Sequence, residues 1–378
     1  MRKVCFIFLF SALYLLSSCS GGRNDNGVVA ETGDTLQLRF ARLLTIVKHP
    51  RYSLVTLADP WHEGKTLHTY VLVPRQDSAQ TGPLPEGTVV YTPVKSSVVF
   101  TTVHCGLLYD LHAEDAISGV CDLKYIQIPD LQRRAAAGSV ADCGNSMGAD
   151  IERLVATKPQ ALIVSPYENY GGYDKLRKIG IPIIEAADYM EATPLGRAEW
   201  MRFYGMLYGK EEEARKLFEQ VSRNYQDLCA KARKSRHRPT VVTERKSGGV
   251  WYVPGGRSFM AQFIHDAGAR YAFSADRSMG SLSLSFEQVL DGAGQSDVWL
   301  YKYGGHPATL AELRAEYDGY TAMKAFRTGQ VYGADTNKNH YFEEASFHPD
   351  WVLQDMITIF HPELKQGPLR YYHRLSAQ

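Results

Sequence analysis

Apolar residues recur with helical spacing along residues 211–234 and form a single stripe. The stripe comprises Ala214, Leu217, Phe218, Val221, Tyr225, Leu228, Cys229 and Ala232. Glutamates stand at residues 211–213 and basic residues stand near the end, which is the charge order that a helix dipole favours. We therefore predict one helix of roughly 35 Å, at about 1.5 Å per residue, that connects two lobes. The alternative is a long surface helix within one domain.

Short apolar segments alternate with helical segments on both sides of this predicted helix. Before it, strands are expected at residues 98–100, 117–121, 161–165 and 181–184, and helices at 103–111, 150–156 and 173–179. After it, strands are expected at 240–243, 298–301 and 330–332, and helices at 258–267, 286–290 and 349–360. This alternation predicts a parallel sheet in each half. Ligands of such sheets bind beyond the carboxyl ends of the strands, so the loops at 101–104, 122–125 and 166–170 are expected to face one crevice.

The chain before residue 88 has a different pattern. Strand-like segments at 36–40, 52–57 and 68–73 predict an antiparallel β appendage. The predicted fold class is α/β, with two Rossmann-like lobes of parallel sheet joined by one long connecting helix, plus this small appendage. The predicted division is a signal peptide at 1–18, a tether at 19–33, the β appendage at 34–87, the N-terminal lobe at 88–190, connecting helices at 191–236 and the C-terminal lobe at 237–378.

The first residues have the features of an export signal. Two basic residues precede the apolar segment Val4–Leu16, which is too short to span a bilayer. The sequence Leu16-Ser17-Ser18-Cys19 resembles the lipobox of bacterial lipoproteins, in which cleavage before the cysteine leaves its thiol acylated. We therefore predict lipidation of Cys19 and a protein held by lipid in the cell envelope, facing the periplasm or the cell surface. A plain secretory signal with an incidental cysteine is the alternative.

The charge balance and the spacing of the cysteines limit which partners and which metal or redox sites are expected. The 378-residue chain has 42 basic and 41 acidic residues, and its basic cluster at 231–238 lies at the end of the predicted helix, so no nucleic-acid partner is expected. Besides Cys5 of the signal and Cys19 of the lipobox there are four cysteines, Cys105, Cys121, Cys143 and Cys229, and they lack the CxxC or CxxxC spacing of zinc or redox sites. We expect buried free thiols, and a disulfide between Cys121 and Cys143 is the alternative.

Several motifs follow the lipobox in a recognisable order. They are Ile117-Ser118-Gly119-Val120, Asp150-Ile151-Glu152-Arg153-Leu154, Lys158-Pro159, Gly180-Ile181-Pro182-Ile183, Tyr208-Gly209-Lys210-Glu211, Ser285-Phe286-Glu287-Gln288-Val289-Leu290, Gly329-Gln330-Val331-Tyr332 and His361-Pro362-Glu363-Leu364. Over residues 98–364 the chain resembles the substrate-binding proteins of ABC importers for iron chelates and cobalamin. It departs from that pattern at Asp150, where many relatives have Asn, and in its β appendage.

The resemblance implies a transport function. A monomer would capture an iron chelate (ferric siderophore or haem) or cobalamin between its lobes and deliver it to an ABC importer permease. No catalytic residue and no cofactor are implied. A weak internal repeat places Glu152 and Glu287 in the first turns of equivalent helices, behind the N-caps Asp150 and Ser285. The helix dipole alone accounts for both glutamates, and the resemblance implies that they also pair with permease arginines.

The candidate ligand contacts lie at the ends of the predicted strands or in the loops beyond them. A large, flat chelate needs aromatic faces together with Arg or amide donors. The predicted ligand-binding residues are Tyr125, Tyr167, Asn169, Tyr170, Arg245, Trp251, Tyr252, Arg257, Tyr301 and Tyr303. For any single one of them, core packing or ordinary exposure is the alternative.

Other functions stay open at this point. A Zn²⁺ or Mn²⁺ binding protein of an ABC importer would need about four converging ligands. Among twelve histidines only His104 and His306 fall in predicted cleft loops, so no metal site is expected. A haem carrier could use a single Tyr or His as axial ligand. An enzyme is disfavoured because the chain has no GxSxG motif, no P-loop and no cysteine array.

Overall fold

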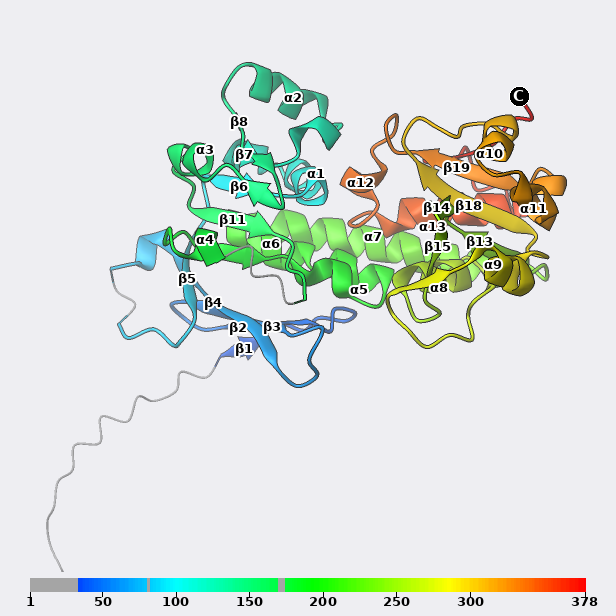
Figure 1. Ribbon diagram of the computed structural model, residues 1–378. Coiled ribbons are helices and arrows are strands. Elements are labelled where there is room, and N and C mark those ends of the chain that lie inside the picture. Colours follow the sequence, from blue (N-terminus) through cyan, green and yellow to red (C-terminus); the bar gives the residue numbers. More distant parts are fainter. Residues whose placement is uncertain (1–32, 80–81, 169–173) are drawn as a thin grey trace, which may run out of the picture. The chain divides into compact units, whose positions relative to one another are not determined.

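The computed structural model describes residues 33–79, 82–168 and 174–378. Two separate sheets, one on each side of helix α7 (Glu211–Ala232) in the sequence, form two α/β lobes and confirm the predicted fold class (Figure 1). The N-terminal sheet has the order β12-β11-β6-β7-β8, and its pairings are all parallel. Its strands are β6 (Ser97–Val99), β7 (Ile117–Val120), β8 (Ala141–Asp142), β11 (Ala161–Val164) and β12 (Ile183–Glu185).

The C-terminal sheet has the order β16-β13-β18-β19-β20, and its pairings are parallel except for that of β19 with β20. Its strands are β13 (Thr240–Thr243), β16 (Arg270–Tyr271), β18 (Val298–Tyr303), β19 (Val331–Asp335) and β20 (Tyr372–Arg374). After β13 the chain adds a small antiparallel sheet of β14 (Lys246–Ser247), β15 (Val250–Pro254) and β17 (Ser281–Leu284). The sequence analysis missed this small sheet.

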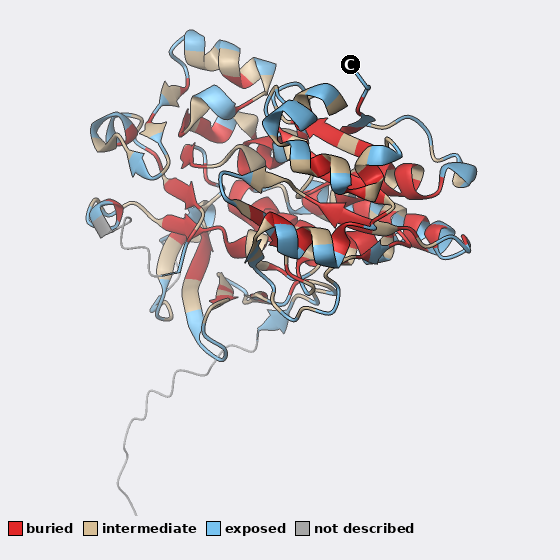
Figure 2. Cartoon of the chain, turned by 45° about the vertical axis from the view of Figure 1, so that its right-hand side comes forward, coloured by how far each residue is buried: buried red, intermediate tan, exposed pale blue. Residues whose placement is uncertain are grey.

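Helices cover both large sheets, and buried residues are concentrated in the strands and in the helix faces that pack on them (Figure 2). The remaining helices are α1 (Thr102–Asp110), α2 (Pro129–Ala136), α3 (Ile151–Ala156), α4 (Asp174–Arg177), α5 (Pro194–Glu199), α6 (Met201–Tyr208), α8 (Phe259–Asp266), α9 (Phe286–Ala293), α10 (Leu310–Glu316), α11 (Lys324–Arg327), α12 (Tyr341–Glu344) and α13 (Pro349–Phe360). The predicted N-caps are present, because Asp150 accepts a hydrogen bond from the amide of Arg153, and Ser285 forms a capping box with Gln288.

Helix α7 belongs to the cores of both lobes. Ala214 and Phe218 in its first half pack in the core of the N-terminal lobe, whereas Val221 and Tyr225 in its second half pack in the core of the C-terminal lobe. Leu217, between them, contacts both cores. The apolar stripe read from the sequence is therefore one surface shared by two lobes, as predicted for a connecting helix.

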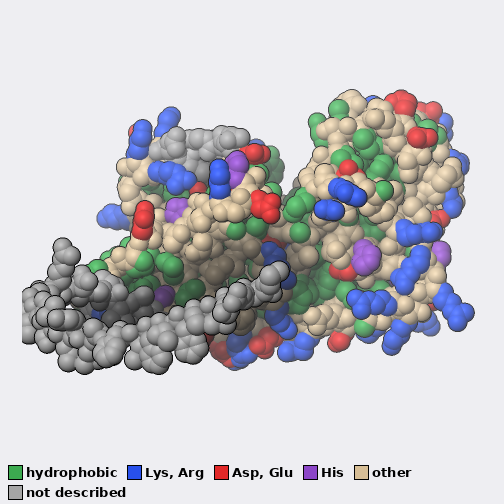
Figure 3. Space-filling view, turned by 90° about the horizontal axis from the view of Figure 1, so that it is seen from below, with side chains coloured by type: hydrophobic (Ala, Val, Ile, Leu, Met, Phe, Trp, Pro, Cys, Tyr) green, Lys and Arg blue, Asp and Glu red, His purple; other side chains and the backbone are tan. Residues whose placement is uncertain are grey.

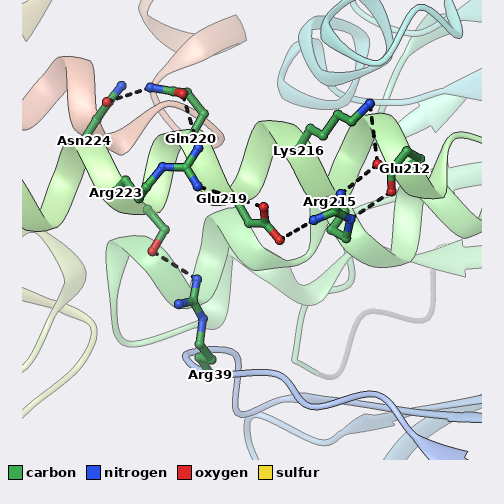
Figure 4. Close-up of polar contacts among 9 residues, drawn as sticks. Arg39, Glu212, Arg215, Lys216, Glu219, Gln220, Arg223 and Asn224 are labelled. Atoms are coloured by element: carbon green, nitrogen blue, oxygen red, sulfur yellow. Dashed lines mark hydrogen bonds and ion pairs between the residues drawn. The ribbon is translucent and has the colours of Figure 1, made fainter.

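Polar contacts run along the outer face of α7 (Figure 4). Arg215 donates hydrogen bonds to Glu212 at 2.7 Å and 2.8 Å and to Glu219 at 2.6 Å. The guanidinium of Arg39, which comes from the appendage, donates to the hydroxyl of Ser222 at 3.4 Å. The exposed face of α7 is thus paired within itself, and the buried Ser222 hydroxyl links the helix to the N-terminal appendage.

The appendage is a five-stranded sheet in the order β1-β2-β3-β4-β5. Its strands are β1 (Asp34–Thr35), β2 (Leu44–Lys48), β3 (Ser53–Ala58), β4 (Thr66–Pro74) and β5 (Thr88–Thr92). Pairings among β1 to β4 are antiparallel, as predicted, but β5 pairs with β4 in parallel because the chain crosses over between them. Residues 88–92, which we assigned to the N-terminal lobe, therefore belong to the appendage sheet.

A second contact joins the lobes besides α7. The hydroxyl of Thr102 in α1 and the amide of Gln127 both donate to Glu343 Oε1 in α12, at 2.7 Å and 2.8 Å. A Cβ atom on Gly106 would lie 2.2 Å from the carbonyl oxygen of Glu343, so only glycine permits this approach of α1 to α12. His348 Nε2 also lies 3.1 Å from a carboxylate oxygen of Asp110. These contacts restrict the movement of one lobe against the other.

Candidate functional site

A cavity of about 700 Å³, which we call the main pocket, lies between the two lobes. Tyr189 and Met190 contribute its N-terminal wall from the short helix η5 (Ala187–Met190), which follows β12. The C-terminal lobe supplies Glu244, Arg245, Lys246, Ser247, Tyr252, Pro254, Ser258, Phe259, Met260, Met279, Gly280, Ser281 and Lys302. The pocket therefore lies at the carboxyl ends of β12, β13 and β18, where ligands of parallel sheets bind.

A smaller side cavity of about 200 Å³ adjoins the main pocket. The two share Phe259, Met260 and Lys302, and the side cavity continues between Val103 and Arg197 of the N-terminal half and the helix α12. In the space-filling view, hydrophobic side chains are visible in the hollow between the two halves of the molecule (Figure 3). The space between the lobes is therefore larger than the main pocket alone.

Lys302 and Glu244 form an ion pair at the floor of the main pocket. Burial lowers the pKa of Lys302, but the Glu244 carboxylate and Tyr341 together raise that pKa by more, so the lysine stays charged. Glu244 follows β13 directly and has a left-handed backbone conformation with φ of 60°. Non-glycine residues adopt this conformation rarely, and such residues cluster at functional sites.

The lining of the main pocket carries more positive than negative charge. Arg245 donates two hydrogen bonds to Glu316, at 2.5 Å and 2.6 Å, and Glu244 offsets Lys302. The ammonium of Lys246 lies 4.2 Å from the centre of the Tyr317 ring and supplies a further positive charge. Helix α8, capped by Ser258, also begins at this pocket, so the positive end of its dipole faces the cavity. The electrostatics favour a ligand with anionic groups.

Large apolar side chains complete the walls. Tyr252 and Met279 are 49% and 53% exposed, and both belong to the lining of the main pocket. Phe259 and Met260 add apolar surface from the first turn of α8. Exposed apolar groups gathered around a few charged ones are typical of small-molecule sites.

Sequence and structure comparisons identify the family. The family model described as "Periplasmic binding protein" matches residues 98–337, which is more than half of the chain. The chain belongs to this family. It is a family of solute-binding transport proteins rather than of enzymes, and its members carry a transported ligand rather than a cofactor.

Relatives and solved structures agree with this assignment. An uncharacterized lipoprotein of Methanocaldococcus jannaschii is 27% identical over 74% of this chain and 68% of its own length. A periplasmic haem-binding protein of Pseudomonas aeruginosa has a TM-score of 0.59 at 18% identity, covering 75% of this chain and 98% of that one. The molybdate-binding protein MolA of Haemophilus influenzae, bound to molybdate, has a TM-score of 0.59 at 16% identity, covering 73% and 89%. At these identities the two structures establish the fold only.

The predicted ligand contacts of this periplasmic binding protein lie in several places. Arg245 and Tyr252 line the main pocket. The ring of Tyr167 is 48% exposed and its centre lies 6.4 Å from that of Tyr189, which lines the pocket. Tyr125 belongs to η3 (Leu123–Tyr125) and is 62% exposed, and the ammonium of Lys124 lies over its ring. Asn169 and Tyr170 lie outside the described residues, and Arg257 lines a different cavity of the C-terminal lobe.

Three of the predicted contacts are core residues, which corrects the sequence interpretation. Trp251, Tyr301 and Tyr303 are 0%, 1% and 5% exposed and belong to one hydrophobic cluster. Alternation along the strands explains the outcome, because Trp251 points into the core while Tyr252 points out of it. Strand β18 continues to Tyr303, two residues beyond its predicted end at Tyr301, so Tyr303 lies in the strand rather than in the loop after it, and Tyr301 lies in the interior of the strand.

Most residues that line the main pocket were not among the predicted ligand contacts. Lys302 was detectable in principle, because it is the one charged residue in a strand of otherwise buried side chains, close to the carboxyl end of that strand. Tyr189 follows a predicted strand of the N-terminal lobe and was detectable by the same rule. Phe259 and Met279 gave no such signal, since their positions depend on the small antiparallel sheet and on the approach of the lobes.

The two histidines considered for a metal site contact different partners and do not share a site. His104 Nε2 lies 2.9 Å from Asp188 and 2.9 Å from the Tyr204 hydroxyl, inside the N-terminal lobe. His306, an exposed residue, pairs with Glu312 at 3.1 Å. Among the described residues, no group of three His, Cys, Asp or Glu side chains could hold a metal ion.

The four predicted free cysteines are free and buried. The thiol of Cys121 lies 3.9 Å from the carbonyl oxygen of Cys143, so these two residues are neighbours at adjacent strand ends without a disulfide. Burial raises the pKa of the Cys143 thiol to about 11, which keeps it protonated and unreactive near neutral pH.

Glu152 and Glu287 occupy equivalent places in the two lobes. Each is exposed in the first turn of its helix, α3 or α9. Hydrogen bonds from its own amide and from the Ser285 hydroxyl lower the pKa of Glu287. The first turn of each helix thus presents one exposed carboxylate.

Proposed function

We propose that this protein captures an iron chelate, either a ferric siderophore or haem, or captures cobalamin, in the main pocket and delivers it to an ABC importer. The observation that carries this proposal is a cavity of about 700 Å³ whose walls come from both lobes and combine aromatic and thioether side chains with an excess of positive charge. Its volume lies within the range of roughly 300–1,000 Å³ that is usual for small-molecule pockets.

Size and chemistry favour a chelate over the smaller ligands of related proteins. One water molecule takes up about 30 Å³ in the liquid, so the main pocket is far larger than a single tetrahedral oxyanion such as molybdate requires. Tyr252, Phe259 and Met279 would meet the apolar faces of a chelate, and Lys246 would meet an anionic group. The same positive charge opposes the binding of bare Zn²⁺ or Mn²⁺.

A binding titration tests this proposal. The purified protein is titrated with a panel of ferric siderophores, haemin, cyanocobalamin, molybdate, Zn²⁺ and Mn²⁺, and heat or fluorescence quenching is measured. We expect one chelate to bind with a stoichiometry of one and neither bare cation to bind. Binding of only a bare cation or only molybdate would refute the proposal.

Docking and membrane attachment complete the proposed function. Glu152 and Glu287 would pair with arginines of the permease, one from each lobe, because charge pairs govern the encounter and register of two proteins. Acylated Cys19, which lies outside the described residues, would hold the protein in the cell envelope. Among the residues that the structure describes, no helix is long and apolar enough to cross a membrane.

A further inference from the structure

A groove beside the main pocket is built partly from the appendage. This appendage groove has a volume of about 230 Å³ and is lined by Arg39, Phe40, Arg42, Leu43, Met190, Glu191, Ala192, Thr193 and Met279. It shares Met190 and Met279 with the main pocket, so the two cavities adjoin. A ligand that fills the main pocket can therefore extend toward the appendage.

Two buried carboxylates hold the appendage segment at the groove. The amide nitrogens of residues 39–41 donate hydrogen bonds to Glu199 at 3.0, 2.7 and 2.9 Å, and those of residues 42 and 43 donate to Glu191 at 2.9 Å each. Glu199 and Glu191 are only 1% and 3% exposed. Five successive amides bound to charged acceptors fix the backbone of this segment. The wall of the groove is therefore preorganised.

The side chain of Arg42 carries a positive charge at the groove that no described residue engages. It is exposed, and no ion pair joins it to a carboxylate among the described residues. Arg39 also lacks an ion pair with a carboxylate among the described residues, but its guanidinium donates to the Ser222 hydroxyl and lies over the rings of Phe40 and Phe218. Glu191, the one acidic residue in the lining, is already occupied by backbone amides and by the Trp200 indole, which donates at 2.9 Å. The formal charges of Arg39 and Glu191 offset each other, so Arg42 gives the lining of the groove its net positive charge.

We infer that the appendage groove is a subsite that binds a carboxylate or oxyanion group of the transported chelate through Arg42. A guanidinium suits this role because its planar donors match two oxygens of such a group. The inference rests on the proposed function and deepens it, since it predicts a ligand that carries an anionic group at one end. It also gives the β appendage a part in ligand binding.

Titration with sodium citrate tests the subsite directly, because this small tricarboxylate carries the anionic group without a metal. We expect the full-length protein to bind citrate, Arg42→Gln to weaken that binding about tenfold, and Arg42→Lys to retain most of it. Lys65→Gln is the matched control, because it removes a positive charge from an exposed turn of the appendage that lies outside the groove lining. The melting temperature of each variant is expected to equal that of the wild type.

Two results would overturn the subsite: equal citrate affinity of the wild type and Arg42→Gln, or no citrate binding by the wild type. Titration of the same samples with ferric siderophores, haemin and cyanocobalamin separates this failure from failure of the proposed function. If a chelate binds but Arg42→Gln leaves the citrate affinity unchanged, the subsite is rejected and the proposed function stands. Citrate binding that depends on Arg42, with no chelate bound, would reject the chelate proposal alone.

Discussion

Two cavities of equal size, about 700 Å³ each, lie on opposite sides of the start of α8, and they differ in their walls. The main pocket takes residues from both lobes. The outer cavity is lined only by residues of the C-terminal lobe between Thr240 and Gly292, including Arg257, His265 and Arg270. Ser258 contributes to both. Volume alone therefore does not identify the binding site.

The more informative difference is which lobes supply the residues that line each cavity. Helix α7 and the contact between α1 and α12 restrict how the lobes move. Small displacements of one lobe change only a cavity that has walls from both, so of these two cavities only the main pocket would change shape with the movement of the lobes. The outer cavity would keep its shape whether the lobes open or close.

Filling each cavity in turn gives the largest expected effect. Gly280→Trp places a large side chain in the main pocket, where a Cβ atom meets nothing within 4 Å. We expect chelate affinity to fall at least about a hundredfold, or roughly 2.7 kcal/mol. Ser274→Trp in the outer cavity should leave affinity within about twofold. Loss of binding in the Ser274 variant, with the Gly280 variant unaffected, would reverse the assignment of the site.

Truncation of neighbouring aromatic residues separates binding from stability. Tyr252→Ala removes an exposed ring from the main pocket, and we expect affinity to fall by about 1–3 kcal/mol with little change in the free energy of unfolding. Trp251→Ala empties a core position, and we expect the free energy of unfolding to fall by about 3–5 kcal/mol while the folded fraction still binds. Denaturant unfolding and titration measure the two quantities, and a Tyr252 variant that loses stability but keeps its affinity would contradict this division.

Docking residues should affect delivery but not capture. The double substitution Glu152→Ala with Glu287→Ala is expected to leave chelate affinity within about twofold, while uptake through the cognate importer falls sharply. Glu213→Ala, in the first turn of α7, is the matched control and should leave uptake unchanged. Equal losses of binding and uptake in the double variant would show that these glutamates contribute to ligand binding rather than to docking.

Removal of the lipid anchor should have the smallest effect on either cavity. Cys19→Ala is expected to move the protein from the membrane fraction to the soluble fraction, because acylation of the thiol is lost. Chelate affinity and melting temperature should stay at their wild-type values. An unchanged membrane fraction would show that Cys19 is not the anchor.

The fold was predictable because its long-range organisation follows local periodicity. The stripe on α7 and the alternation of strands and helices are visible over many residues, and errors of two residues at an element end do not change the topology. The parallel pairing of β4 with β5 was not predictable in this way, because parallel and antiparallel pairing of these short strands leave the same apolar pattern in the sequence. The mixed sheet of the appendage was therefore missed.

The site was less predictable, because small local errors change which side chains face a ligand. A two-residue extension of β18 places Tyr303 in the core beside Tyr301 and leaves Lys302 at the pocket. The antiparallel sheet of β14, β15 and β17 assigns Trp251 and Tyr252 to opposite faces. Residues such as Met279 and Arg42 reach the cleft only through contacts between distant segments, which a single sequence does not record.

Anomalous diffraction from crystals grown with the bound chelate tests the central claim most directly. Data collected at the absorption edge of the bound metal locate that atom independently of the protein coordinates. We predict a single anomalous peak in the main pocket, between Tyr189 of one lobe and Tyr252 of the other. A peak in the outer cavity beside Arg257 and Arg270, with the main pocket empty, would contradict the account.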